Sequence, residues 1–195
     1  MLYHCLITLV LAWEVSPLCK NPEVVDNFDS KKYTDDFFVA AIEVRNPIDQ
    51  LLLYTATCFS FNKSAVNPDT ETNSYDLKFA TGGLSPLTIT NSFNVVTPKK
   101  GLIKFFFPIR QVYYMDHVIC TDYTSYSINY ACENTSAVYG TSEIIFVMVR
   151  NPKDFKKIIN LEEVKNCLAR ITDKSARQMK LIGNKNCGST SKYIT

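Results

Sequence analysis

Eight short segments rich in β-branched and aromatic residues follow one another between residues 37 and 150, and they limit the fold more than any other feature. Asn, Asp, Pro and Gly separate the segments, which cover residues 37–44, 52–61, 74–80, 86–97, 101–109, 112–123, 125–132 and 142–150. Segments of this length and spacing are typical of an antiparallel sandwich or barrel. No repeat, charge block or linker divides them, so a single domain is expected.

A helix is expected after the last of these segments. Asn151 has the character of a helix N-cap, and Pro152 suits the first helical position. Within 161–172, four apolar residues fall on one helical face: Leu161, Val164, Leu168 and Ile171. Segments 37–44 and 142–149 are apolar on both faces. The sequence therefore predicts a mainly β fold, a closed eight-stranded antiparallel barrel, with the C-terminal helix packed outside against these two segments.

Successive side chains of a strand point to opposite faces, so residues two apart in each segment can be assigned to the same face of the barrel wall. In 112–122, Asp116 and Asp122 share one face with Cys120, and the two carboxylates indicate that this face is the wetter, outer one. The side chains expected to point inward, here and in the neighbouring segments, are Ile103, Phe105, Phe107, Tyr113, Met115, His117, Ile119, Tyr126, Ile128 and Tyr130. An eight-stranded barrel interior is filled by side chains or holds one small ligand.

Residues 1–18 read as a secretory signal peptide. The apolar run from Cys5 to Trp13 is about nine residues, far below the ~20 that a membrane-spanning helix needs, and no other stretch could span a bilayer. Cleavage is placed between residues 12 and 18, which leaves 19–195 as the mature, extracellular domain. Sequons at Asn62 and Asn134 agree with export.

Removing the signal leaves an even number of cysteines: Cys19, Cys58, Cys120, Cys132, Cys167 and Cys187. In an oxidising compartment they predict three disulfides, for which 15 connectivities exist. The assignment of side chains to the two faces of the barrel wall predicts one of these disulfides by itself. Cys120 would lie on the outer wall, and Cys167 borders the apolar face of the helix that packs there. No metal site is expected, since no C-x-x-C spacing occurs and the mature chain keeps a single histidine, His117.

Several short landmarks follow one another along the mature chain, at Cys19–Asn21, Asn27–Tyr33, Cys58, Tyr113–Tyr114, Tyr130–Cys132, Ile145–Asp154 and Asn184–Cys187. Their order and spacing resemble those of the nitrophorin and triabin-like salivary lipocalins of blood-feeding insects. The resemblance covers nearly the whole mature chain and implies an up-and-down lipocalin barrel. It also implies pairing of Cys19 with Cys132 and of Cys58 with Cys187.

The sequence departs from the haem-carrying members of that family. Their proximal histidine precedes an Asp-Pro or Asn-Pro turn, which corresponds here to Asn67-Pro68, and the matching residue is Ala65. The Gly-x-Trp start of ordinary lipocalins is also missing, with Phe37 and Phe38 in its place. No cofactor is therefore expected. Haem remains an alternative only if the inward-facing His117 replaces the missing ligand.

Catalysis and nucleic-acid binding find little support in the composition. The net charge is +2 at pH 7, and no G-x-S-x-G, phosphate loop or H-E-x-x-H occurs, so we expect a protein that is not an enzyme. A barrel instead supplies a concave, mostly apolar cavity with a few polar groups. The residues proposed for such a pocket are Phe105, Phe107, Tyr113, Met115, His117, Tyr126, Tyr130, Asp49 and Glu133, and either of the two carboxylates could hold an amine.

The resemblance implies a monomeric protein that sequesters a small host mediator, such as a biogenic amine, a nucleotide or an eicosanoid, to oppose haemostasis and inflammation. Two alternatives stay open. One is a haem-based nitric oxide carrier. The other is an inhibitor that binds a host clotting protein through its surface, for which loops 62–74 and 133–142 could serve.

Overall fold

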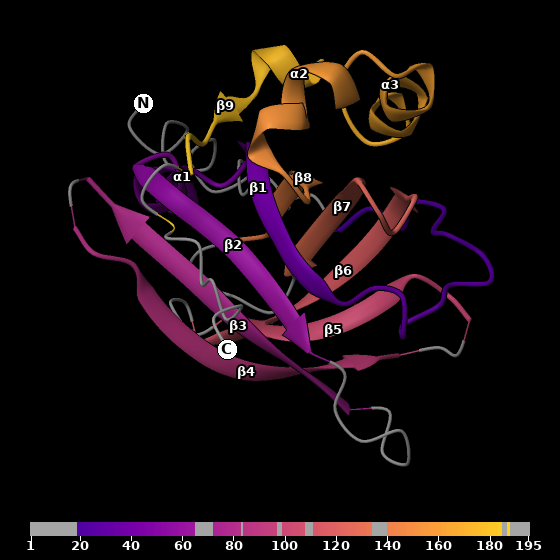
Figure 1. Ribbon diagram of the computed structural model, residues 1–195, viewed down its shortest axis with the longest axis horizontal. Helices are drawn as coiled ribbons and strands as arrows, with labels where there is room; N and C mark the ends of the chain where they lie inside the picture. Colours follow the sequence, from indigo (N-terminus) through magenta and orange to yellow (C-terminus); the bar gives the residue numbers. More distant parts are fainter. Residues whose placement is uncertain are drawn as a thin grey trace, which may run out of the picture.

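An antiparallel β-barrel forms the body of the computed structural model, which describes residues 19–64, 72–82, 84–96, 99–107, 111–133, 140–184 and 187 (Figure 1). Its strands are β1 (Asp35–Val44), β2 (Ala56–Ser64), β3 (Thr72–Thr81), β4 (Leu87–Val95), β5 (Leu102–Phe107), β6 (Val112–Thr121), β7 (Tyr126–Glu133) and β8 (Ser142–Val149). Consecutive strands pair antiparallel, and β1 pairs with both β2 and β8. The expected eight-stranded up-and-down barrel is confirmed.

Short helices and one further strand complete the fold. Helix α1 (Pro47–Leu53) connects β1 to β2, where the sequence predicted a loop at 45–51 and a strand that begins at residue 52. After β8 come η1 (Pro152–Asp154), α2 (Phe155–Ile158), α3 (Glu162–Ala169), η2 (Ala176–Gln178) and β9 (Lys180–Leu181), which pairs with β1. None of the helices in the described ranges is long and apolar enough to cross a membrane.

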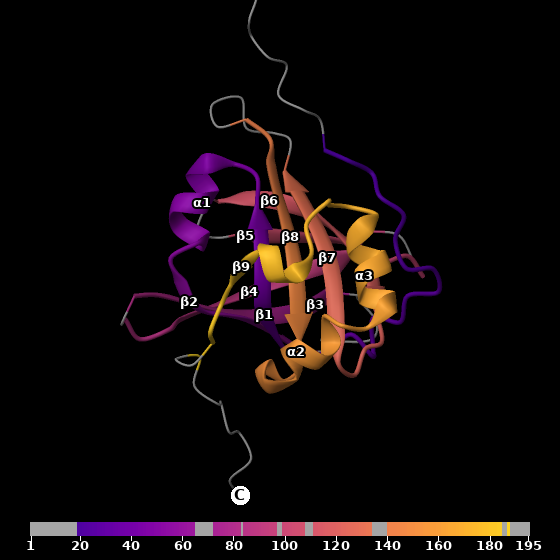
Figure 2. The same ribbon diagram turned by 90° about the horizontal axis from the view of Figure 1, so that it is seen from above.

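The C-terminal helix lies outside the barrel, but not where the sequence placed it. Helix α3 packs over β6 and β7, whereas η2 and β9 lie along β1 (Figure 2). As expected, Val164, Leu168 and Ile171 are buried against the barrel wall, while Leu161 is partly exposed. A disulfide explains this position of the helix, because Cys167 of α3 is bonded to Cys120 of β6.

Three disulfides tie the outer segments to the barrel. The structure contains the expected pairs Cys19–Cys132, Cys58–Cys187 and Cys120–Cys167, with Cα–Cα distances of 5.8, 4.9 and 6.3 Å. The first holds the N-terminal segment against β7, and the second holds the end of the described chain against β2. Of the expected sequons, Asn62 is described, and its side-chain amide donates to Asp36 across the β1–β2 pair (2.8 Å). Asn134 and the signal peptide, 1–18, lie outside the described residues.

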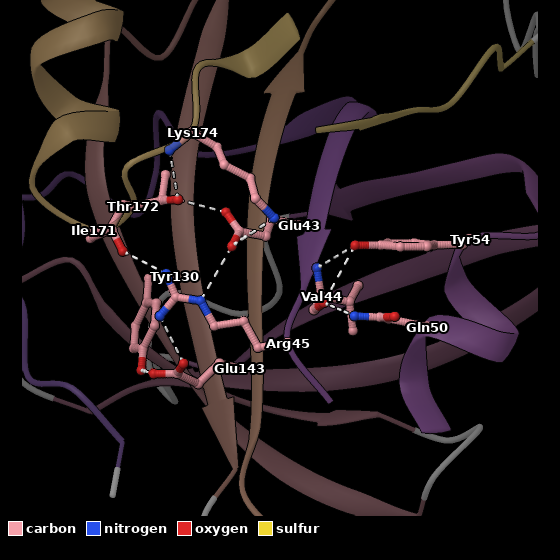
Figure 3. Close-up of polar contacts among 10 residues, drawn as sticks. All are labelled: Glu43, Val44, Arg45, Gln50, Tyr54, Tyr130, Glu143, Ile171, Thr172 and Lys174. Carbon is pink, nitrogen blue, oxygen red and sulfur yellow. Dashed lines mark hydrogen bonds and ion pairs between the residues drawn. The ribbon is translucent and has the colours of Figure 1, made fainter. Parts of the chain in front are cut away.

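A buried ionic network also attaches the C-terminal segment to the barrel (Figure 3). Arg45, just after β1, donates to Glu143 of β8 (2.8 Å), to Glu43 of β1 (3.3 Å) and to the carbonyl of Ile171 (3.1 Å). Glu43 also accepts from the hydroxyl of Thr172 (2.6 Å). Its other cationic neighbour, Lys174, lies 3.5 Å away and is half exposed. Arg45 is therefore the group that two nearly buried carboxylates share.

Gly101 marks a close approach between the N-terminal segment and β6. Its amide donates to Val25 and its carbonyl accepts from Val118, and an added Cβ would lie 3.0 Å from both the Cβ and the carbonyl oxygen of Val118. We expect Gly101→Ala to lower the free energy of unfolding by about 1 to 3 kcal/mol, because backbone and a β-branched side chain must shift. Gly183→Ala is the matched control, since nothing lies within 4 Å of its added Cβ. Equal urea midpoints for the two variants would contradict this account.

Candidate ligand-binding site

Aromatic side chains from five strands fill the interior of the barrel. Phe59 and Phe61 of β2 both pack edge-on against Phe146 of β8, and Tyr75 of β3 packs edge-on against Phe105 and at a tilt against Phe93. They leave a hollow whose lining residues are Phe61, Lys63, Tyr75, Phe93, Ile103, Phe105, Asp116, Phe146 and Met148. The cavity volume open to water is only about 20 Å³. The interior therefore has room for little more than a water while every ring keeps its place.

Two of the lining residues are charged, and neither meets an opposite charge directly. Lys63 is 8% exposed, and its Nζ lies 3.6 Å from the ring centroid of Tyr33. The rings of Phe37 and Phe93 stand 5.6 and 5.7 Å from the same atom. Within the described parts of the chain, no hydrogen bond and no ion pair within 4.0 Å is formed by this ammonium group. Cation–π contacts are thus its main local stabilisation.

Asp116 approaches the same hollow from β6 and is 7% exposed. Its Oδ2 accepts from the side-chain amide of Asn129 (2.7 Å), which also donates to the Tyr33 hydroxyl (3.2 Å). Its Oδ1 is buried and has no hydrogen-bond partner among the residues that the structure describes. A buried carboxylate oxygen without a partner carries an uncompensated desolvation cost, which a donor brought by a ligand would relieve.

Burial displaces the pKa of both charged groups toward their neutral forms. Desolvation lowers the pKa of Lys63 to about 7, with Arg150 acting in the same direction and the Asp116 carboxylate opposing it. Desolvation raises the pKa of Asp116 to about 6, against the opposing influence of Lys63 and the Asn129 hydrogen bond. Near neutral pH the cavity therefore holds a carboxylate beside an amine that is only partly protonated.

The Lys63 shift predicts a pH-dependent stability. Between about pH 7 and 10.5 the unfolded chain binds the Lys63 proton and the folded chain does not, so the free energy of unfolding should rise with pH. The slope from this group is at most ~1.4 kcal/mol per pH unit. Urea titrations across this range should show the rise in the wild type, and Lys63→Met should show less of it. Parallel curves for the two proteins would contradict the assignment.

Comparison with known proteins identifies the architecture. No family model and no curated protein matches the sequence. Among solved structures, insecticyanin from the tobacco hornworm Manduca sexta superposes with a TM-score of 0.60 at 18% identity, over 81% of this chain and 82% of that one. The allergen Per a 4 from cockroaches gives 0.62 at 15% identity, over 87% and 97% of the two chains. The tryptamine complex of the amine binding protein of Rhodnius prolixus gives 0.59 at 13% identity, over 89% of each. The chain has the lipocalin fold.

At one end of this lipocalin barrel lies a second polar cluster, beneath helix α1. Asp49 of α1 is buried and accepts from the hydroxyl of Ser142 on β8, which in turn accepts from the Tyr114 hydroxyl (2.8 Å). Glu133 pairs with Ser142 in the β7–β8 register and is also buried. The two carboxylates proposed from the sequence are thus brought to the same end of the barrel. Neither lines the hollow that contains Asp116.

Several predicted pocket residues lie on the outer wall of the lipocalin instead. Phe105 lines the hollow and Phe107 lies in the interior core, as expected. The assignment of faces in β6 is wrong, because Tyr114, Asp116 and Val118 point inward. The predicted inward residues that face outward are Tyr113, Met115, His117, Ile119, Tyr126, Ile128 and Tyr130. Of these, Tyr113 is 58% exposed, and Ile119, Tyr126, Ile128 and Tyr130 are covered by the C-terminal segment.

The position of His117 bears on the haem alternative. Its ring packs against Tyr130 on the outer wall, and its Nδ1 is buried without a hydrogen-bond partner among the described residues. The interpretation of His117 as an interior haem ligand is therefore wrong. Ala65 and the Asn67-Pro68 turn lie outside the described residues, as does most of the two loops, 62–74 and 133–142, considered for binding a clotting protein.

Sequence reasoning missed the two residues that give the cavity its charge. Lys63 was excluded because the predicted segment ended at residue 61, although the inward alternation of Phe59 and Phe61 continues to Lys63. Asp116 was assigned to solvent because a carboxylate usually marks the wetter face. The partner that makes an inward carboxylate tolerable is Asn129 of the adjacent strand, which pairs with Val118 and donates to Asp116, and this register is set by the fold.

Proposed function

We propose that this protein is a secreted lipocalin that binds a small aromatic amine inside the barrel and withholds it from its receptors. The observation that carries the proposal is the unpartnered Oδ1 of Asp116 in a hollow lined by aromatic rings. An alkylammonium group would supply the missing donor as a charge-assisted hydrogen bond. The aromatic part of the ligand would then replace ring–ring contacts that already exist around the hollow.

Two further facts support an amine as the ligand. The solved structure from Rhodnius prolixus with the same fold is a tryptamine complex of an amine binding protein. In this chain, the lowered pKa of Lys63 lets the cavity lose its own positive charge when a cationic ligand enters. Amine affinity should therefore rise between about pH 6 and 8, as Asp116 becomes ionised and Lys63 loses its proton.

Sequestration rather than turnover fits the same geometry. Since the hollow has room for little more than a water, a ligand of about ten non-hydrogen atoms enters only when lining rings turn aside. A site that admits its ligand only when side chains move is suited to slow release. Three disulfides suit an extracellular location, where the amine would be a mediator of the host response.

Calorimetry tests the proposal directly. The mature protein is titrated with tryptamine, serotonin and histamine, and with haem, ADP and a fatty acid as other ligand classes. We expect at least one amine to bind, and Asp116→Asn to weaken its binding by about 10- to 100-fold. Asp76→Asn is the matched control, since Asp76 accepts from Thr90 at an exposed site on β3. Amine affinity that is unchanged in Asp116→Asn, or binding restricted to the other ligands, would overturn the proposal.

A further inference from the structure

Lys63 has the environment of a nucleophilic amine, which amine binding at Asp116 does not use. Its Nζ lies inside the barrel against the Tyr33 ring, with the rings of Phe37 and Phe93 beyond it. The same hollow is lined by Asp116, whose Oδ1 has no partner among the described residues. An unsolvated amine beside a carboxyl group in an apolar cavity is the arrangement that favours addition to carbonyl compounds.

We propose that Lys63 captures small aromatic or unsaturated aldehydes inside the barrel as a reversible imine. This inference goes beyond the proposed function, because it concerns another residue, another ligand class and a covalent bond. It rests on the proposed function in one respect, which is that the hollow opens to a small ring compound.

The reaction balances without any oxidant or reductant. The lone pair of the neutral Nζ forms a C–N bond to the aldehyde carbon, the C=O π bond breaks, and one proton passes from nitrogen to oxygen to give a carbinolamine. The hydroxyl group then leaves as water with a second proton, and the C=N bond forms. One aldehyde and one amine thus give one imine and one water, and hydrolysis reverses the sequence.

Asp116 is placed to move these protons. Asp116 lines the hollow and its buried Oδ1 has no partner among the described residues, while the space there suffices for about one water, which can bridge the carboxyl group and the reacting atoms. The carboxylate would accept the proton released by nitrogen, and the carboxylic acid would return it to the departing hydroxyl group. Asn129 holds Oδ2, so the free oxygen keeps a fixed direction.

The apolar surroundings also distinguish Lys63 from surface lysines. Desolvation lowers its pKa to about 7, so about half of the molecules carry the neutral amine at pH 7. An ordinary exposed lysine, with a pKa near 10.4, is neutral in only ~1 molecule in 2,500 at that pH. Lys104 provides a close comparison, because its Nζ also lies over a tyrosine ring, that of Tyr113 at 4.9 Å, but at an exposed position.

Reductive trapping with peptide mapping tests the inference on the disulfide-bonded mature protein. The protein is incubated at pH 7 with trans-cinnamaldehyde and sodium cyanoborohydride, and adducts are located by mass spectrometry. We expect adduct at Lys63 in about tenfold or greater excess over any other lysine. Lys63→Met should abolish this adduct, Lys104→Met should leave it unchanged, and Asp116→Asn should slow its formation. Mapping on the wild type identifies the site even if a variant folds poorly.

The outcomes separate this inference from the proposed function when tryptamine calorimetry is run on the same preparation. Adducts spread over the exposed lysines, or none at Lys63 while tryptamine binds, would overturn the imine and leave amine binding standing. Adduct at Lys63 without amine binding would support the imine and overturn the amine proposal. Neither adduct at Lys63 nor amine binding would overturn both.

Discussion

Replacing Cys58 and Cys187 together by serine is expected to lower the free energy of unfolding by about 4 to 5 kcal/mol. The bridge joins residues 129 apart, so breaking it restores a large part of the freedom of the unfolded chain. It also holds the segment that contains Asn184, whose side chain accepts from the Phe59 amide (3.0 Å) and donates to the Val39 carbonyl (2.7 Å). Urea denaturation of the double variant measures the loss.

The pair Cys120–Cys167 supplies the control for this first prediction. It joins residues only 47 apart, so the corresponding double serine variant should lose about 1 kcal/mol less. A larger loss from Cys120–Cys167 than from Cys58–Cys187 would show that packing of α3 on the barrel, rather than chain entropy, determines the ranking.

Arg45→Met is expected to lower the free energy of unfolding by about 3 to 5 kcal/mol. The substitution leaves Glu43 and Glu143, whose side chains are 5% and 9% exposed, without the cation they share. It also removes the donor to the Ile171 carbonyl, so the turn after α3 should loosen first. Thermal or urea unfolding measures the total loss, and amide hydrogen exchange at residues 171–174 reports the local effect.

One comparison makes the Arg45 prediction specific. Lys174→Met removes a half-exposed partner of Glu43 and should cost less than about 1 kcal/mol. A loss from Lys174→Met as large as that from Arg45→Met would contradict this account.

The strand sequence and the number of strands could be predicted because each strand is a separate run of β-forming residues between turn residues. Segment 142–150, for example, corresponds to β8 at Ser142–Val149. Helix α1 could not be predicted as easily, since its seven residues are too few to show a helical period. Its signal was local: the Asn46 side chain accepts from the Ile48 amide, and Pro47 occupies the first helical position.

Which side chains face the cavity was harder to predict, and β6 shows why. The prediction placed Cys120 on the outer wall because it lies an even number of residues from Asp116 and Asp122. In the structure Asp116 points inward, a β-bulge between Val118 and Cys120 reverses the alternation, and Cys120 still reaches Cys167. Asp122 follows the strand and caps a turn, accepting from three backbone amides. The disulfide was predicted correctly on a premise that was wrong.

Strand β7 shows a second limit. All eight of its residues are buried, because its inner face points into the barrel interior and its outer face lies under α3 and the N-terminal segment. The strand does alternate, but its polar residues Ser127 and Asn129 lie on the inner face, where they bond to Tyr33 and Asp116, whereas a polar face usually marks the solvent side. Tyr126 and Tyr130 were therefore assigned to the wrong side, and only the tertiary packing of the two terminal segments resolves the choice.

The aromatic side chains that fill the barrel limit the volume available to a ligand, and each of them can be substituted separately. Most of the volume that a guest would need is occupied by the side chains of Phe61, Phe93, Phe105 and Phe146, which are themselves free of polar anchors. Shortening Phe61, Phe105 or Phe146 to leucine would enlarge the chamber at a modest cost in stability and leave Asp116 and Lys63 in place. The size of the accepted molecule and the chemistry that holds it are therefore separable properties of this scaffold.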